Sequence, residues 1–266
     1  MRLLFIGDIF GKPGRQLLKP AIPRLVQQHE IDLVIANVEN AAGGSGITPE
    51  TGAEILAAGV AVMTSGNHIW DKREAIQYIS IEQRLLRPAN YPRGVPGLGS
   101  CVVHTPSGDP VGVLNLMGRV FMLNIDDPFH AALAEIERLR TETPVIVVDF
   151  HAEATSEKIA MGWHLDGRCT AVLGTHTHVQ TADARILPGG TAYITDVGMT
   201  GPHDSIIGVE KSAALGRFLN AMPVRFDAAT GDPRLHAVVV TTEPATGRAL
   251  AIERLSLDKA EIGNLP

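Results

Sequence analysis

The chain has 266 residues, of which 45% are hydrophobic and 20% are charged, and these ordinary shares exclude a disordered, collagen-like or coiled-coil protein. Its formal net charge of -6 argues against a broad nucleic-acid-binding surface, which would be basic, but is compatible with a small phosphate-bearing substrate. No apolar run is long enough for a membrane helix, and two cysteines, Cys101 and Cys169, are too few for a disulfide scaffold, so we expect a cytoplasmic protein that binds no membrane.

The first two predicted strands both end on acidic residues. Residues 2–8 form a short apolar run that finishes at Gly7 and Asp8, which predicts a buried strand with Asp8 at its carboxyl end. A helix is expected over residues 14–29. Residues 32–39 repeat the apolar pattern and lead into Glu39 and Asn40. Carboxylates are therefore expected at the ends of two neighbouring strands.

The third strand-and-helix unit introduces a histidine. A helix is predicted over residues 48–58, with the first of these as its N-cap. A short strand over residues 60–64 then leads to Asn67 and His68, and Asp71 is expected to cap the next helix. Alternating strands and helices predict a layered α/β fold with a largely parallel sheet. Ligands of such sheets gather at the carboxyl ends of the strands.

The rest of the chain adds two hairpins and three strands that end on polar residues. The hairpins are predicted over residues 101–116 and 236–257, and a helix over residues 128–140. The three strands cover residues 145–148, 171–174 and 192–195, and lead to His151, to His176 and His178, and to Asp196. There is no internal repeat or convincing linker, so residues 1–266 are expected to form a single domain.

Almost every predicted strand thus ends in a side chain able to bind a metal. The oxygen and imidazole donors include no thiolate, which suits iron, manganese, zinc or nickel better than copper, and the histidine share disfavours magnesium or calcium alone. Each donor alone has an ordinary alternative: Asp8 as a turn residue, Glu39 and Asn40 as a loop opening, His151 as a helix cap. The whole constellation favours a metal site.

The balance of charge favours two metal ions over one. Two divalent ions carry a formal charge of about +4, and two carboxylates with a bridging hydroxide leave about +1 for an anionic phosphodiester. Glu39 is expected to bridge the ions with its two oxygens. Asn67, and Asn40 if it takes part, would serve the second ion without quenching its charge. His176 and His178, two positions apart on an extended segment, lie on one side of the chain and can reach neighbouring ions.

Five segments resemble the YmdB-like bacterial branch of the calcineurin-like metallophosphoesterases. They cover residues 7–15, 37–41, 149–158, 174–183 and 195–201. The resemblance implies a four-layer α/β/β/α sandwich with two mixed β-sheets, the metallophosphoesterase fold. It also implies a phosphodiesterase acting on cyclic nucleotides, the 2′,3′-cyclic kind included, with iron or manganese as the metals. A homo-oligomer is compatible with it.

The branch's functional residues can be carried over position by position. Its metal ligands fall on Asp8, Glu39, Asn40, Asn67, His151, His176 and His178, and its proton donor falls on His68. Phe10 stands where most members of the wider superfamily have a metal-binding histidine, and Glu39 with Asn40 replaces their Gly-Asp segment. Both departures are similar to the YmdB-like branch. The implied reaction is attack on phosphorus by a metal-bridging hydroxide, with His68 protonating the leaving alkoxide.

Other functions and roles stay open at this point. A metal-dependent phosphomonoesterase or nucleotidase would use the same scaffold, as would a regulatory protein that retains metal without catalysis. Activity on 3′,5′-cyclic nucleotides is also open. Four residues near the predicted site have undecided roles, either at the substrate or in ordinary packing: His203, Glu153, Lys12 and Arg15. Glu153 in particular is placed to orient a ligand imidazole.

Overall fold

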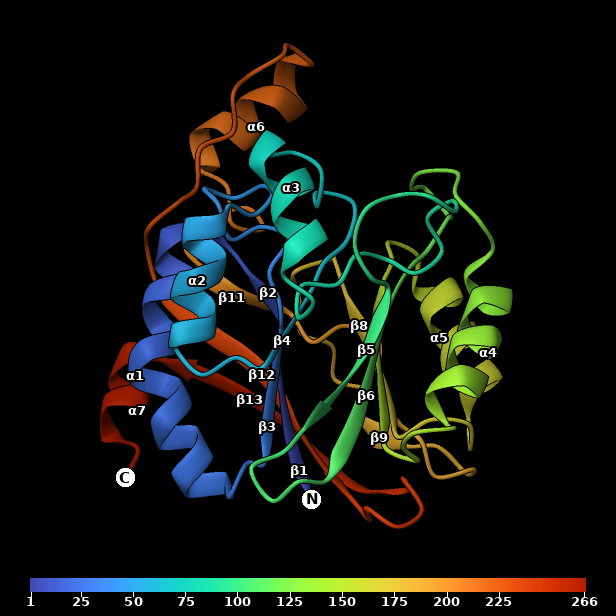
Figure 1. The fold of residues 1–266 in the computed structure, drawn as a ribbon. Helices are drawn as coiled ribbons and strands as arrows, with labels where there is room; N and C mark the ends of the chain where they lie inside the picture. Colours follow the sequence, from blue (N-terminus) through green and yellow to red (C-terminus); the bar gives the residue numbers. More distant parts are fainter.

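The computed structural model describes residues 1–266, and two facing β-sheets form its centre (Figure 1). The first sheet has the strand order β2-β11-β12-β1-β3-β4, with β13 paired to β12. Its strands are β1 (Arg2–Ile6), β2 (Asp8–Ile9), β3 (Leu33–Asn37), β4 (Val62–Thr64), β11 (Met199–Pro202), β12 (Pro233–Thr242) and β13 (Ala249–Asp258). Because β1 runs parallel to β3 and antiparallel to β12, the sheet is mixed.

The second sheet is mixed as well and has the order β5-β6-β7-β8-β10-β9. Its strands are β5 (Ser100–His104), β6 (Pro110–Met117), β7 (Ile146–His151), β8 (Ala171–Thr175), β9 (Arg185–Ile186) and β10 (Ala192–Ile194). The central strands β6, β7, β8 and β10 are parallel, and the outer strands β5 and β9 are antiparallel to their neighbours.

Helices cover the outer face of each sheet, which completes four layers (Figure 1). The first sheet is covered by α1 (Gly11–His29), α2 (Pro49–Ala57), α3 (Arg73–Ile81) and α7 (Lys259–Asn264), and the second by α4 (Pro128–Leu139) and α5 (Thr155–Leu165). Helix α6 (Lys211–Asn220) projects from one end of the molecule. No helix is both long and apolar enough to cross a bilayer.

Three separate hydrophobic cores account for the four layers. Strand β1 alternates between two of them: Leu4 and Ile6 face the core under α1, while Leu3 and Phe5 face the second sheet. The third core lies between the second sheet and its helices. A strand buried on both faces has no polar alternation, which explains the continuous apolar run at the start of the chain.

Most predicted elements are present, and the expected four-layer α/β fold with two mixed sheets is confirmed. The largely parallel sheet predicted from the first units is wrong for the first sheet, because the C-terminal strand β12 inserts antiparallel beside β1. Asp71 does not cap α3; the N-cap is Lys72, without a side-chain hydrogen bond. Helix α1 begins at Gly11 rather than at residue 14. Local sequence patterns did not indicate β2, β9, β11, α6 or α7.

Candidate metal centre

The predicted metal ligands lie together where the strands of both sheets end. Asp8 begins β2, and Glu39 and Asn40 follow β3. Asn67 follows β4, His151 ends β7, and the pair His176 and His178 follows β8. A cavity of about 400 Å³ opens onto this cluster and is lined by Glu39, Asn40, His68, His176 and His178 among others. The structure therefore draws the cluster from the first and the second sheet alike.

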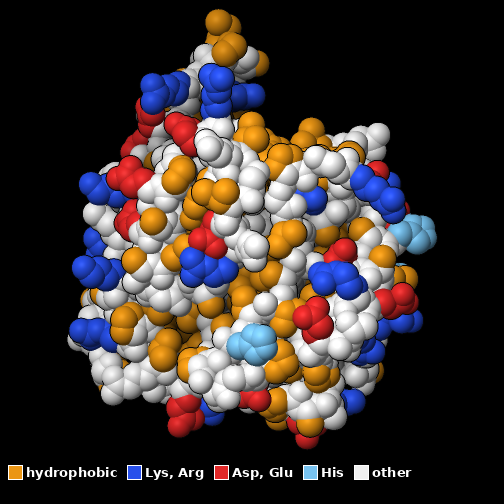
Figure 2. Space-filling view, viewed as in Figure 1, with side chains coloured by type: hydrophobic (Ala, Val, Ile, Leu, Met, Phe, Trp, Pro, Cys, Tyr) orange, Lys and Arg blue, Asp and Glu red, His pale blue; other side chains and the backbone are white.

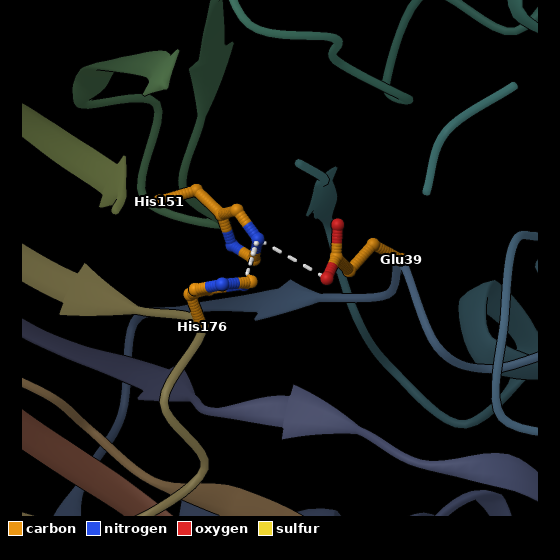
Figure 3. A group of neighbouring side chains, drawn as sticks. All are labelled: Glu39, His151 and His176. Atoms are coloured by element: carbon orange, nitrogen blue, oxygen red, sulfur yellow. Dashed lines mark hydrogen bonds and ion pairs between the residues drawn. The ribbon is translucent and has the colours of Figure 1, made fainter. Parts of the chain in front are cut away.

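His151 is the centre of one group of donors. Its Nε2 lies 3.1 Å from Glu39 Oε1, 3.0 Å from Asn67 Oδ1 and 3.0 Å from His176 Nδ1. Figure 3 shows Glu39 and His176 pointing toward the His151 ring. Donor atoms of Glu39, His151 and His176 all lie within 4.8 Å of one another, as they would around one ion. This group fits a first-row divalent metal.

A second group adjoins the first through Glu39. The Asn40 side-chain amide lies 3.1 Å from Glu39 Oε1 and 3.2 Å from His178 Nε2. Asp8 Oδ1 is 3.9 Å from that same His178 nitrogen, and it is fully buried without any hydrogen-bond partner. A buried carboxylate oxygen left unpaired is costly, and a cation would satisfy it. The residues present therefore fit a second metal ion.

The three imidazoles each keep one nitrogen for the cluster because the other nitrogen is already held. Thr175 Oγ1 lies 2.9 Å from His151 Nδ1, and the Ile207 carbonyl accepts from His178 Nδ1 at 2.8 Å. Glu153 Oε2 lies 3.1 Å from His176 Nε2. Such outer partners fix the tautomer and the ring orientation of metal-binding histidines.

The charges within the cluster depend strongly on one another. Burial opposes ionisation of Glu39, but the adjacent His151 outweighs it and lowers the pKa of the carboxyl to about 2. Burial likewise disfavours a charged His151, yet Glu39 and Asp8 raise its pKa to about 9. Burial and the neighbouring His151 lower the pKa of His176 to about 3. The buried Glu39 carboxylate is thus stabilised in its charged form by adjacent positive charge, which metal ions would also supply.

The segment that carries His176 and His178 has an unusual backbone. Both residues have positive φ, 103° and 67°, although neither is glycine. The carboxylate of Asp196 fixes the turn, because its Oδ2 accepts from the Thr177 amide at 3.0 Å and from the Thr177 hydroxyl at 2.7 Å. Lys158 Nζ donates to the same oxygen at 2.6 Å, and both charged side chains are buried.

His68 lies at the wall of the cavity, outside the donor groups. Its backbone amide donates to Glu39 Oε2 at 3.1 Å, and its Nδ1 lies 2.7 Å from Asp71 Oδ2. The imidazole is 39% exposed. Asp71 therefore orients His68 and leaves Nε2 as its other nitrogen. The three-residue spacing between the two could have suggested this pair; nothing in the sequence indicated Lys158, because buried lysines are rare.

Close packing explains two further residues of the site. A Cβ atom on Gly66 would lie 2.1 Å from His151 Cδ2, so only glycine leaves room for the imidazole at this position. Phe10 packs edge to face against His178, with ring centroids 5.6 Å apart. The aromatic ring thus packs directly against a histidine of the second donor group.

Three residues with undecided roles lie away from the cavity. Arg15 donates to Glu54 and to the Ala41 carbonyl, which anchors the loop after β3. Lys12 is exposed and does not line the cavity. His203 packs edge to face against His236, with ring centroids 4.4 Å apart, and does not line the cavity either. Of the four residues whose roles the sequence left undecided, only Glu153 contacts a predicted ligand, His176.

Comparisons with known proteins agree in fold and sequence over nearly the whole chain. The chain is 48% identical to a 2′,3′-cyclic-nucleotide 2′-phosphodiesterase of Bacillus subtilis (strain 168), over 97% of each chain. A hypothetical protein from Thermus thermophilus superposes with a TM-score of 0.91 and 44% identity, covering 97% of this chain and 99% of that one. A phosphatase of Mycoplasma pneumoniae superposes with a TM-score of 0.91 and 33% identity, covering 97% and 93%.

A family model agrees with these relatives. The model that describes YmdB-like proteins matches residues 4–255, which include every strand of both sheets except the ends of β1 and β13. The predicted resemblance is therefore confirmed. The chain belongs to the YmdB-like family of metallophosphoesterases.

Proposed function

We propose that this protein is a metal-dependent phosphodiesterase that hydrolyses 2′,3′-cyclic nucleotides with two divalent metal ions. The observation that carries the proposal is the set of three imidazoles whose outer nitrogens are each held by a partner, so that the inner nitrogens face the cluster of proposed ligands. The unpaired, buried Asp8 oxygen beside them supports the second ion. The Bacillus subtilis relative supports the substrate class.

The two donor groups divide the ligands between the ions. Asn67, His151 and His176 would hold one ion, and Asp8, Asn40 and His178 the other, with Glu39 between them. Oxygen and nitrogen donors without thiolate suit iron, manganese, zinc or nickel, and among these the family resemblance favours iron or manganese. When bound, such ions supply Lewis acidity toward the phosphoryl oxygens and lower the pKa of the attacking water.

His68 is proposed as the proton donor to the leaving alkoxide. It lines the cavity, and Asp71 holds its Nδ1, which leaves Nε2 to carry the proton. Because an alkoxide is a poor leaving group near neutral pH, a positioned acid contributes about 10²- to 10⁴-fold to the rate. The hydrogen bond from the His68 amide to Glu39 ties the proton donor to the metal ligands.

The substrate is proposed to be a small diester. The cavity of about 400 Å³ accommodates a mononucleotide but no long polymer, and the chain's net charge of -6 offers no broad basic surface for one. A phosphomonoester is the second candidate, because the Mycoplasma pneumoniae relative of the same fold is described as a phosphatase.

The test is turnover of 2′,3′-cyclic and 3′,5′-cyclic nucleotides, linear diesters and phosphomonoesters by metal-loaded wild type and His68→Ala. We expect the wild type to hydrolyse 2′,3′-cyclic nucleotides, and the variant to lose about 10²- to 10⁴-fold in kcat while it keeps its metals. Faster turnover of monoesters would contradict the substrate class. Metal-loaded wild type without any turnover would leave only a binding or regulatory role.

A further inference from the structure

A second cavity lies directly beside the one that holds the metal ligands. It measures about 490 Å³ and extends toward helix α6. Ile207, Val209 and Phe226 line both cavities, so the two cavities adjoin along these three apolar residues. Ile207 also accepts the hydrogen bond of His178 through its carbonyl group. Ile207, which lines both cavities, therefore also orients the proposed metal ligand His178.

The second cavity is chemically different from the first. Seven of its eight lining residues are hydrophobic, and the eighth is Arg217. The Arg217 guanidinium lies 5.4 Å from the centroid of the Phe226 ring. The Phe226 side chain is 43% exposed, which leaves part of its ring open to a ligand. An aromatic ring with a cation nearby is a favourable surface for a planar, weakly polar group.

A cyclic nucleotide has two parts that match these two cavities. Its phosphodiester is anionic and belongs with the metals, whereas its base is a flat aromatic group that stacks on side chains such as Phe. The two cavities adjoin along Ile207, Val209 and Phe226, so one small molecule that lies over these residues reaches into both. We infer that the nucleobase of the substrate lies in the α6-side cavity, stacked on Phe226. This inference rests on the proposed function, because it presumes that the phosphate is bound at the metal ligands.

Helix α6, next to this cavity, exposes several apolar side chains to solvent. Of the residues in α6 only Ala214 is buried, while Leu215, Phe218 and Leu219 are more than half exposed. In Figure 2 the projection that holds α6 carries hydrophobic side chains at its tip. Exposed apolar groups gathered in one place indicate a binding surface. Of these three side chains only Phe218 lines the second cavity, and a base seated between α6 and Phe226 would cover it.

The experiment separates the base from the phosphate. Steady-state kinetics are measured for 2′,3′-cyclic AMP and for ribose 2′,3′-cyclic phosphate, which has no base. The proteins are wild type, Phe226→Leu and the control Phe121→Leu, whose phenylalanine is 89% exposed and lines neither cavity. We expect Phe226→Leu to lower kcat/KM for the nucleotide on the order of 10- to 100-fold. For the base-free substrate we expect a much smaller loss, so that the ratio of the two kcat/KM values falls by most of that factor.

The possible outcomes distinguish the base site from the phosphodiesterase activity and from a contact between copies of the chain. Equal losses on both substrates, or no loss on either, would overturn the base site while leaving the phosphodiesterase intact. A change in molecular mass in solution with unchanged kinetics would instead make the surface a contact between copies of this chain. If wild type hydrolysed neither substrate, the proposed function would fail. Equilibrium binding of 2′,3′-cyclic AMP then decides the base site: an equal Kd for wild type and Phe226→Leu contradicts it.

Discussion

The outer nitrogen of each proposed ligand histidine has a different kind of partner. A hydroxyl holds His151, a backbone carbonyl holds His178, and a carboxylate holds His176. A carboxylate makes the imidazole it contacts more basic, so His176 should bind its metal more tightly than geometry alone would give. The Glu153 side chain that supplies this carboxylate is 48% accessible. It can therefore be replaced with little effect on folding.

Replacement of Glu153 by Gln tests this role directly. The amide keeps an acceptor for His176 Nε2 but removes the charge, so we expect metal affinity to fall on the order of 10- to 100-fold. Competition with a chelator for bound Mn²⁺ measures the change. Glu74→Gln is the matched control, since Glu74 is an exposed glutamate on α3 that does not line the cavity. Equal affinities in the two variants would mean that Glu153 does not orient His176.

Single residues of the site differ in how far the sequence predicts them. The proposed ligands could be found because each follows a recognisable apolar strand, as Asp8 and Glu39 do. Of their outer partners, Glu153 could be suggested from its position two residues after His151, but Thr175 and the Ile207 carbonyl could not, because they have no distinctive sequence pattern. Asp71 shows the same limit: its position before a helix suggested a cap, but its carboxylate contacts His68 instead. Local pattern cannot tell which of two nearby donors a carboxylate will meet.

At the scale of elements, helix α5 is tied to the site by one buried ion pair. Lys158 of α5 and Asp196, just after β10, are 1% and 0% exposed. Asp196 in turn holds Thr177 between the two ligand histidines. The pair therefore connects the helix layer of the second sheet to the left-handed turn that presents His176 and His178.

Lys158→Met should be strongly destabilising, because it leaves the Asp196 carboxylate buried without its cation. We expect a loss of about 3–5 kcal/mol in the free energy of unfolding, measured by urea denaturation. The double variant Lys158→Met with Asp196→Asn removes the charge as well, and it should recover part of the loss while the amide oxygen still accepts from Thr177. A single variant as stable as wild type would show that the pair is not needed to hold the turn.

The elements that the sequence failed to predict share a physical cause. Strand β11 contains Gly201 and Pro202, and it is a strand because β2 and β12 pair with it on either side. In helix α1, which the sequence predicts apart from its first turn, burial has the opposite effect: the helix continues through Pro20 and Pro23 because one face packs on the first core. Long-range pairing and burial thus override local preference in both directions.

At the scale of the whole molecule, strand β12 holds the first sheet together. It pairs with β1, β11 and β13, and it carries His236. Burial and the nearby His203 lower the pKa of His236 to about 4, from an ordinary value of 6.5. The folded protein therefore keeps this imidazole neutral over a pH range in which the unfolded chain would protonate it.

This difference makes the fold sensitive to acid. Between about pH 6.5 and pH 4 the unfolded state binds the extra proton, so stability falls as the pH is lowered through that window, by up to about 3 kcal/mol from His236. His236→Asn should remove that slope, so that the variant approaches or exceeds wild-type stability near pH 4. Urea denaturation at several pH values measures this dependence of the free energy of unfolding on pH. His104→Asn, at an exposed position, is the control and should keep the wild-type slope.

The place of β12 in the chain also bears on the order in which a nascent protein can mature. Asp8 and Glu39 leave the ribosome early, but β1 lies between β3 and a strand made of residues 233–242. At ordinary rates of synthesis the interval between them is on the order of ten seconds or more. During that time the early carboxylates have no completed sheet to position them. We therefore expect the full set of proposed ligands to assemble only after nearly the entire chain has been translated.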